Sequence, residues 1–383
     1  MIAGRERCAR RGLQLPRHIP GRVSPDCGHK RPTHRTRLSQ QCGFTLLEMV
    51  LVVFIMGTLA AVSLSFIENE NHQQRFEDTR KRLMSINRAV VGEGVAQYGG
   101  ESQLSGYAVD NGVLPGSIDN VLNKPTDYDD YALQDPVFDP NPDATTGLNN
   151  GGGTALNGTG EQLFKGFRRG YLAVPPTTTG SAYRDGWGRD FIVTTGPPLV
   201  VTSMGADGVD NNPEVAGLSS DISTAVADAD WQVDIASWQV TLTNSTGVDI
   251  DTFTSGTEGM RLSLLVYEND GDAINAYNWR RFTTNELIDC LDGDGDGLVG
   301  ASVCTSFSTL TFPVGGYPGG TLDTKISQGR HLLVLIEDDN TTHDGVGEIP
   351  CGTARCKSTI PRTTYQVILH ARTVLPQINV VIR

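Results

Sequence analysis

The chain has 383 residues, a length sufficient for two domains, and a formal net charge of −13 at pH 7. The charge is unevenly distributed: residues 1–43 carry ten basic and two acidic residues, whereas the remainder carries 21 basic and 42 acidic residues. An acidic body lacks the basic surface that nucleic-acid binding requires, so a nucleic-acid partner is excluded and cation binding is favoured.

The first predicted segment, residues 1–43, is a basic leader whose content of proline, arginine and cysteine predicts no regular structure. Its length suggests the hypothesis that translation begins later, at Val23 or Leu38. The leader precedes 24 residues, Phe44 to Ile67, in which Glu48 is the one charged residue. This run is long enough to cross a hydrocarbon core of roughly 30 Å as a helix. The basic flank predicts a cytoplasmic N-terminus and an acidic body outside the membrane.

Two other interpretations of this helix are a signal peptide and a plain membrane anchor. A signal peptide usually has a shorter apolar core that ends in a small-residue cleavage site. A plain anchor should not carry a carboxylate one turn inside its cytoplasmic edge, because burying the charge of Glu48 costs a few kcal/mol. Neither interpretation explains Glu48.

The residues at the cytoplasmic edge of this helix read GFTLLE, from Gly43 to Glu48. They resemble the processing motif of type IV prepilins, in which a peptidase cuts between the glycine and the aromatic residue. The resemblance implies a prepilin peptidase/N-methyltransferase that cuts after Gly43 and methylates the new N-terminus of Phe44. It also implies that Glu48 pairs with the Phe44 amine of a neighbouring pilin-type subunit.

A physical reason supports this pairing. A carboxylate and an ammonium group are each costly in an apolar bundle of helices, whereas together they are tolerated and fix the register of the helices. The resemblance therefore implies an inner-membrane protein with a periplasmic head, which an assembly machinery builds into an envelope filament.

Beyond the membrane the helix is predicted to continue to about Tyr98. Four apolar residues, Phe76, Leu83, Ile86 and Val90, recur at helical spacing, and no proline interrupts the segment. Gly92, Gly94, Gly99 and Gly100 then weaken the pattern. Residues 99–180 are rich in glycine, asparagine, aspartate and proline, and this composition predicts a long surface loop.

Two strands are predicted after this loop, in the segments DGWGRDFIV at 185–193 and LVVTSMGADG at 199–208. Over residues 185–222 the pattern resembles in part the head of the major pseudopilin of type II secretion. Gly186 and Asp190 stand where that family has proline. The loop after the second strand binds calcium in the family, which implies that Asp207 and Asp221 supply ligands here. Asp210, which lies between them, offers a further oxygen. A solvated acidic loop is the alternative.

Residues 230–383 consist of short apolar runs separated by turns rich in glycine, aspartate and asparagine. This pattern predicts an antiparallel β-sandwich. The runs are Trp238–Leu242, Leu262–Tyr267, His331–Ile336, Tyr365–His370 and Ile378–Ile382. His331 and His370 lie at strand edges, and we interpret both as structural residues.

A second candidate calcium site lies within the predicted sandwich, in the sequence LDGDGDGL at 291–298. Asp292, Asp294 and Asp296 have the spacing of the first half of an EF-hand loop, and Leu298 offers a carbonyl oxygen. The twelfth position is Val303 instead of the usual glutamate, so the loop needs Asp289 or another segment to complete the shell. An acidic turn without metal is the alternative.

Four cysteines lie in the acidic part of the chain, in two pairs that are close in sequence. An even number of cysteines outside the cytoplasm predicts disulfides, and their proximity favours Cys290–Cys304 and Cys351–Cys356. Zinc is the alternative, although the spacings match no common zinc finger.

Together these features predict an α+β protein with four parts: a leader at 1–43, a helix at 44–98, a pseudopilin-like head at 99–229 and a β-sandwich at 230–383. The membrane span is residues 44–67. The expected function is that of a minor or tip subunit of a type II secretion pseudopilus or type IV pilus. The alternative is a displayed adhesin or substrate-binding module. The sequence contains no common hydrolase or nucleotide-binding motif, so we do not expect an enzyme.

Overall fold

The structure is a computed structural model that describes most of the chain after the leader. The described residues are 45–92, 96–98, 101–139, 153–156, 161–168, 170–173, 183–196, 198–210, 217, 220–251, 259–269, 278–288, 290–299, 302–312, 323–338, 349–350 and 364–383. The chain divides into two compact units, Met1–Val62 and Ser63–Arg383. The fold is α+β, as the sequence predicts: an apolar N-terminal helix precedes several small sheets.

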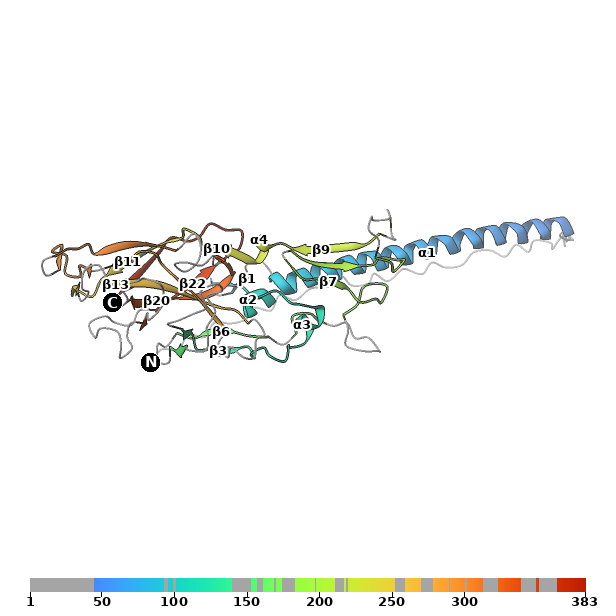
Figure 1. Cartoon of the computed structure of the whole chain (residues 1–383). Coiled ribbons are helices and arrows are strands. Elements are labelled where there is room, and N and C mark those ends of the chain that lie inside the picture. Colours follow the sequence, from blue (N-terminus) through green and yellow to red (C-terminus); the bar gives the residue numbers. More distant parts are fainter. Residues whose placement is uncertain are drawn as a thin grey trace, which may run out of the picture. The chain divides into compact units, whose positions relative to one another are not determined.

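The long helix α1, Leu46–Val91, begins slightly later and ends earlier than the predicted helix at 44–98 (Figure 1). The prediction that it reaches Tyr98 is wrong, because the helix stops at Gly92. This glycine has φ +100°, which L side chains rarely adopt, and its N–H donates to the Arg88 carbonyl at 2.7 Å. Tyr98 lies instead in a two-stranded hairpin, β1 (Ala96–Tyr98) and β2 (Glu101–Gln103).

The apolar face of the C-terminal part of α1 packs on a small antiparallel sheet. Leu83, Ile86 and Val90 are each at most 2% exposed, which agrees with the predicted helical spacing. They share a core with residues of the sheet β7-β8-β9 and with Trp231. The strands are β7 (Ile192–Thr194), β8 (Leu199–Ser203) and β9 (Ile222–Val226), and the short helix α4 (Asp228–Trp231) follows them.

The C-terminal region forms two larger sheets around a second core. One has the order β18-β11-β23, and the other contains β14-β13-β20-β21, with β22 also paired to β20. The first sheet comprises β11 (Gln239–Asn244), β18 (Phe307–Thr311) and β23 (Ile378–Ile382). The second comprises β13 (Gly259–Tyr267), β14 (Trp279–Thr283), β20 (Gly329–Asp338), β21 (Ile349–Pro350) and β22 (Thr364–Leu369).

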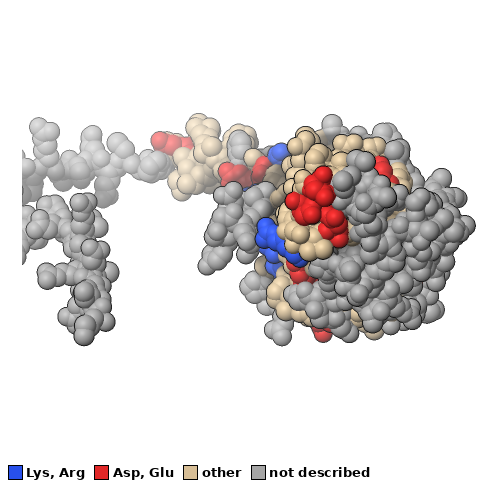
Figure 2. All heavy atoms as spheres, turned by 90° about the vertical axis from the view of Figure 1, so that its left-hand side faces the viewer, with Lys and Arg blue, Asp and Glu red and all other residues tan. Residues whose placement is uncertain are grey.

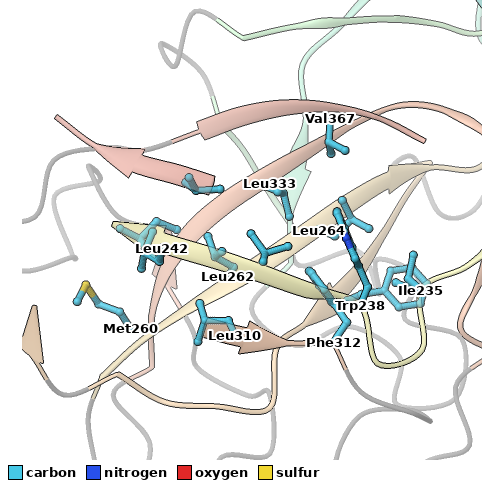
Figure 3. Packing of buried hydrophobic residues seen from close by; sticks show 14 of the residues in the cluster. Ile235, Trp238, Leu242, Met260, Leu262, Leu264, Leu310, Phe312, Leu333 and Val367 are labelled. Atoms are coloured by element: carbon cyan, nitrogen blue, oxygen red, sulfur yellow. The ribbon is translucent and has the colours of Figure 1, made fainter. Parts of the chain in front are cut away.

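Side chains from both of these sheets fill the space between them. Leu242 and Leu310 come from one sheet, and Leu262, Leu264 and Leu333 come from the other (Figure 3). All five predicted apolar runs overlap strands of this sandwich. One detail of the prediction is wrong: the sandwich is not wholly antiparallel, because β11 and β23 pair in parallel.

The segment predicted to be a long surface loop contributes a third core. Its described residues include Phe138, Leu156 and Leu163, which pack on Leu332, Val334 and other residues of the second sheet. Strand β13 is therefore buried on both faces, which explains why most of its residues are apolar, with Arg261 and Ser263 as the exceptions. The elements of this segment are α2 (Tyr107–Asn111), α3 (Ile118–Leu122), β3 (Ala132–Gln134), β4 (Val137–Phe138), β5 (Thr154–Ala155) and β6 (Leu163–Lys165).

Short strands complete the region. They are β10 (Gln232–Asp234), β12 (Ile250–Asp251), β15 (Cys290–Leu291), β16 (Leu298–Val299), β17 (Ser302–Val303) and β19 (Lys325–Ser327). Three antiparallel pairs join them: β10 with β19, β12 with β15, and β16 with β17.

Candidate functional sites: an apolar helix and an acidic loop

The first part of α1 is apolar on all sides and exposed. Residues Leu46–Leu64 have a mean hydropathy of 2.3, and none of this segment is buried within the protein. Phe54 and Val53 are both 68% exposed. Nineteen helical residues rise roughly 28 Å, close to the thickness of a bilayer core. Such a surface is stable in lipid or against other apolar helices, and not in water.

Glu48 lies in the first turn of α1. Thr45 caps the helix, and its side-chain oxygen accepts a hydrogen bond from the Glu48 N–H at 3.3 Å. The exposed carboxylate therefore stands beside the positive end of the helix dipole, where a negative charge is favoured. Gly43 and Phe44, the predicted cleavage residues, lie outside the described residues.

Three aspartates cluster at one loop of the sandwich. Among the residues described, Asp249, Asp292 and Asp294 bring one carboxylate oxygen each to within 4.8 Å of one another. Asp292 is 4% exposed and Asp294 is exposed. Figure 2 shows one face of the molecule on which acidic side chains gather beside a smaller basic group.

The buried Asp292 organises the backbone of this loop. Its two carboxylate oxygens accept hydrogen bonds from the N–H groups of Gly295 at 2.7 Å and Gly297 at 3.0 Å. Asp249 accepts one from the Gly293 N–H at 3.0 Å, and Asp294 accepts one from the Asp296 N–H at 3.0 Å. These bonds bend the loop around its carboxylates, as in a calcium-binding turn.

The remaining predicted ligands of this loop are not part of this group. Asp296 is exposed and is not within the group of three carboxylates, and Leu298 begins the hairpin β16–β17 in place of the helix of an EF-hand. Asp289 lies outside the described residues. The three carboxylates match the oxygen ligands that calcium prefers, and further oxygens would have to complete a shell of six to eight.

Asp249 is the ligand candidate that sequence analysis missed. It reaches the loop through the antiparallel pair β12–β15, in which Ile250 lies opposite Leu291. Continuing this register places Asp249 opposite Asp292. Nothing in the local sequence signals the pairing, since the two aspartates are far apart along the chain.

Cys290 and Cys304 enclose the acidic loop and form a disulfide, with their Cα atoms 5.9 Å apart. The bridge restricts the ends of the loop and so reduces the entropy that the loop loses when it is ordered. Cys351 and Cys356 lie outside the described residues, and their pairing stays a prediction.

The other predicted calcium loop has a different environment. Asp207 accepts a hydrogen bond from the Val209 N–H at 3.0 Å, but the described part of this loop does not bring Asp207, Asp210 and Asp221 into one carboxylate group. Arg189 donates to the carbonyl oxygens of Gly205 at 2.6 Å and Ala206 at 3.1 Å. A guanidinium group thus already occupies two oxygens of this turn.

Comparison with known proteins identifies the N-terminal segment. Residues 38–64 match the family model described as the prokaryotic N-terminal methylation motif. No curated protein and no solved structure matches the chain, and the resemblance of residues 185–222 to pseudopilins is not confirmed. The motif implies processing by a prepilin peptidase and assembly with other pilin subunits. The chain therefore carries the N-terminal methylation motif of prepilins, and this motif supports a pilin-type subunit of a pilus or secretion filament.

Proposed function

We propose that this protein is a minor or tip subunit of an envelope filament, either a type II secretion pseudopilus or a type IV pilus. The observation that supports this proposal is the exposed apolar segment Leu46–Leu64, which overlaps the methylation motif at residues 38–64. Before assembly this segment spans the inner membrane once, with the basic leader in the cytoplasm and the acidic head in the periplasm. The role is structural and not enzymatic.

Assembly depends on Glu48 in this proposal. Cleavage after Gly43 leaves Phe44 with a free ammonium group, one residue before the Thr45 cap of α1. In a bundle of apolar helices, the Glu48 carboxylate of one subunit neutralises the Phe44 ammonium of the next. A subunit at the wrong stagger leaves both charges unpaired in an apolar environment, so the filament machinery incorporates only the correct register.

The variant Glu48→Val tests this role. We expect the peptidase to cleave it normally, because the cleavage site is intact, and we expect its amount in sheared filaments to fall several-fold. Glu70→Val is a matched control, since Glu70 is an exposed carboxylate of the same helix beyond the apolar segment. Incorporation of Glu48→Val at the wild-type level would rule out the pairing.

The second candidate function is the display of a binding module. The observation that favours it is the sandwich itself, which has a core of its own, separate from the core around α1. Its partner would be a surface or a secreted protein. Substitution of exposed apolar residues of the sandwich, Phe307→Ala or Val374→Ala, leaves the cores in place. A variant that leaves filaments intact but abolishes surface attachment or secretion would favour this function.

We also propose that the acidic loop binds calcium through Asp249, Asp292 and Asp294. Their proximity supports this proposal, as does the disulfide that closes the loop. A ligand that binds only the folded state stabilises it by about 2.7 kcal/mol at a concentration 100 times its Kd.

Thermal unfolding of the full-length chain in detergent, with calcium or with chelator, tests the calcium site. Calcium should raise the Tm of the wild type and should raise that of Asp294→Asn much less. Asp127→Asn, an exposed aspartate outside both candidate loops, is the control and should respond like the wild type. An equal response of Asp294→Asn and the wild type would exclude this loop as the site.

A further inference from the structure

A cavity of about 580 Å³ lies beside the outer face of the second sandwich sheet, and neither filament assembly nor calcium binding uses it. Its walls come from α2, the β3–β6 pair, β20 and β22. The volume lies within the range of small-molecule sites, roughly 300 to 1,000 Å³. All of these elements belong to the same compact unit, Ser63–Arg383.

The charged residues of the cavity give it a positive balance. Lys165, Arg168 and Arg330 line it together with a single carboxylate, that of Asp110. This balance is opposite to that of residues 44–383, which carry 21 basic and 42 acidic residues. A concave site of one sign with low-dielectric walls concentrates ligands of the opposite charge. The cavity therefore favours an anionic ligand.

Two charged residues of the cavity, Lys165 and Asp110, are buried, and each has a polar partner. Lys165 is 2% exposed, and its Nζ donates to the Val109 carbonyl at 2.8 Å. Burial lowers the pKa of Lys165 to about 8, and the charge of Asp110 opposes this shift. Asp110 is 2% exposed and pairs with Nε of Arg168 at 3.1 Å. Burial raises the pKa of Asp110 to about 6.

Aromatic rings form another wall. The rings of Tyr131 and Phe164 stack with centroids 5.7 Å apart, and the guanidinium of Arg168 lies 4.2 Å from the centroid of Tyr131. Phe164 is 57% exposed, an unusual position for a large apolar ring. A ligand that stacks on this ring would shield it from water, while its acidic group faces the arginines.

We propose that this cavity binds an acidic monosaccharide, a sugar ring that carries a carboxylate. The ring packs on the Phe164 side of the cavity, and the carboxylate lies between Arg168 and Arg330. Arg330 suits this task because the planar guanidinium of arginine can donate two parallel hydrogen bonds to a carboxylate, whereas Arg168 already directs Nε and Nη2 at Asp110 and contributes mainly its charge. The amides of Gln162 and Gln366, which also line the cavity, are donors and acceptors for hydroxyl groups.

Isothermal titration of the full-length chain in detergent with D-galacturonate tests the proposal, with D-galactose as the neutral analogue. We expect saturable binding of galacturonate and at least about tenfold weaker binding of galactose, a loss of about 1.4 kcal/mol. Arg330→Gln should weaken galacturonate binding about tenfold. Because Arg330 is exposed, this substitution should leave the fold intact, and an unchanged Tm checks this.

Arg184→Gln is the matched control, since Arg184 is a partly exposed arginine outside the cavity, and it should bind galacturonate like the wild type. Inorganic phosphate distinguishes a general anion site from a sugar-acid site. Any of three results would overturn the proposal: no binding of galacturonate, equal binding of galactose or phosphate, or wild-type affinity in Arg330→Gln.

Discussion

At the scale of single residues, Gly186 determines how closely the turn at 185–188 approaches α1. Its N–H donates to Oγ1 of Thr79 at 2.9 Å, and the Thr79 hydroxyl in turn donates to the Arg75 carbonyl at 2.8 Å. The turn thus lies directly on α1, and a Cβ at position 186 would collide with the Arg75 carbonyl oxygen. A proline at this position would collide there and would also remove the donor.

Gly186→Ala should therefore destabilise the protein by about 1–3 kcal/mol, the usual cost of overpacking. Gly116→Ala is the matched control, because the nearest atom to a Cβ there is the Asn120 side-chain oxygen, at an ordinary contact distance of 3.6 Å. Chemical denaturation measures both. Equal stabilities of the two variants would show that the turn does not pack on α1 as described.

His331 provides a pH-dependent prediction at the same scale. It is fully buried, with Nε2 2.8 Å from the Ser327 carbonyl oxygen, and burial lowers its pKa to about 3, helped by the charge of Lys165. The unfolded chain, with a histidine pKa near 6.5, binds a proton that the folded chain does not. This residue therefore reduces stability as the pH falls from about 6.5 towards 3.

Asp110 has the opposite effect on stability as the pH falls. Its raised pKa makes the folded chain bind more protons than the unfolded chain between about pH 6 and pH 4, which stabilises the folded chain. The comparison of wild type with His331→Phe separates the two effects, because both chains contain Asp110. We expect the unfolding free energy of the wild type to fall relative to that of His331→Phe between pH 7 and pH 4. A difference that is constant with pH would contradict a buried neutral histidine.

At the scale of secondary-structure elements, Gln328 links the sandwich to the end of α1. Its side-chain amide donates to the Val91 carbonyl at 3.0 Å, and its side-chain oxygen accepts from the Ala371 N–H at 3.2 Å. Its own N–H donates to the Trp231 carbonyl at 2.7 Å. One side chain, 6% exposed, thus satisfies the last carbonyl of α1 and a turn after β22.

Gln328→Ala should leave two half-buried backbone groups without their side-chain partner, each at a cost of up to about 1–3 kcal/mol. We expect lower stability in chemical denaturation and faster hydrogen exchange in the last turn of α1. Gln366→Ala, at an exposed glutamine of β22 that lines the cavity and does not contact the end of α1, is the control and should change neither. Unchanged exchange in α1 would mean that Gln328 does not hold the helix end.

The elements that sequence could predict are those whose pattern is local. The apolar runs of β13, β20 and β23 and the spacing of Leu83, Ile86 and Val90 identify strands and helix face directly. The sequence did not predict that the segment 99–180 covers the second sheet, because its buried residues Phe138, Leu156 and Leu163 are scattered among glycine and asparagine. Likewise, two carboxylates of the acidic loop were predictable from DGDGDG, whereas Asp249 depends on the register of β12 against β15.

At the scale of the whole molecule, size and charge bear on the place of the subunit in a filament. Residues 92–383 follow α1. They contain the sandwich, the segment 99–180 that packs on it, and the small sheet that packs on the helix. In filaments of this kind, helices pack at close spacing, so every head shares a crowded surface. A head of this size fits more easily at an end or as a rare projection than at every position.

We therefore expect this protein to be much less abundant than the main subunit in sheared filaments, as measured by quantitative mass spectrometry. Charge gives an independent reason, because the 42 acidic and 21 basic residues after the leader would repel one another if this chain repeated along the filament. Calcium at the acidic loop would relieve only part of this repulsion. Filaments prepared with calcium and with chelator provide the control, and the protein should stay scarce in both. If it is the most abundant pilin-type protein in either preparation, its assignment as a minor subunit is wrong.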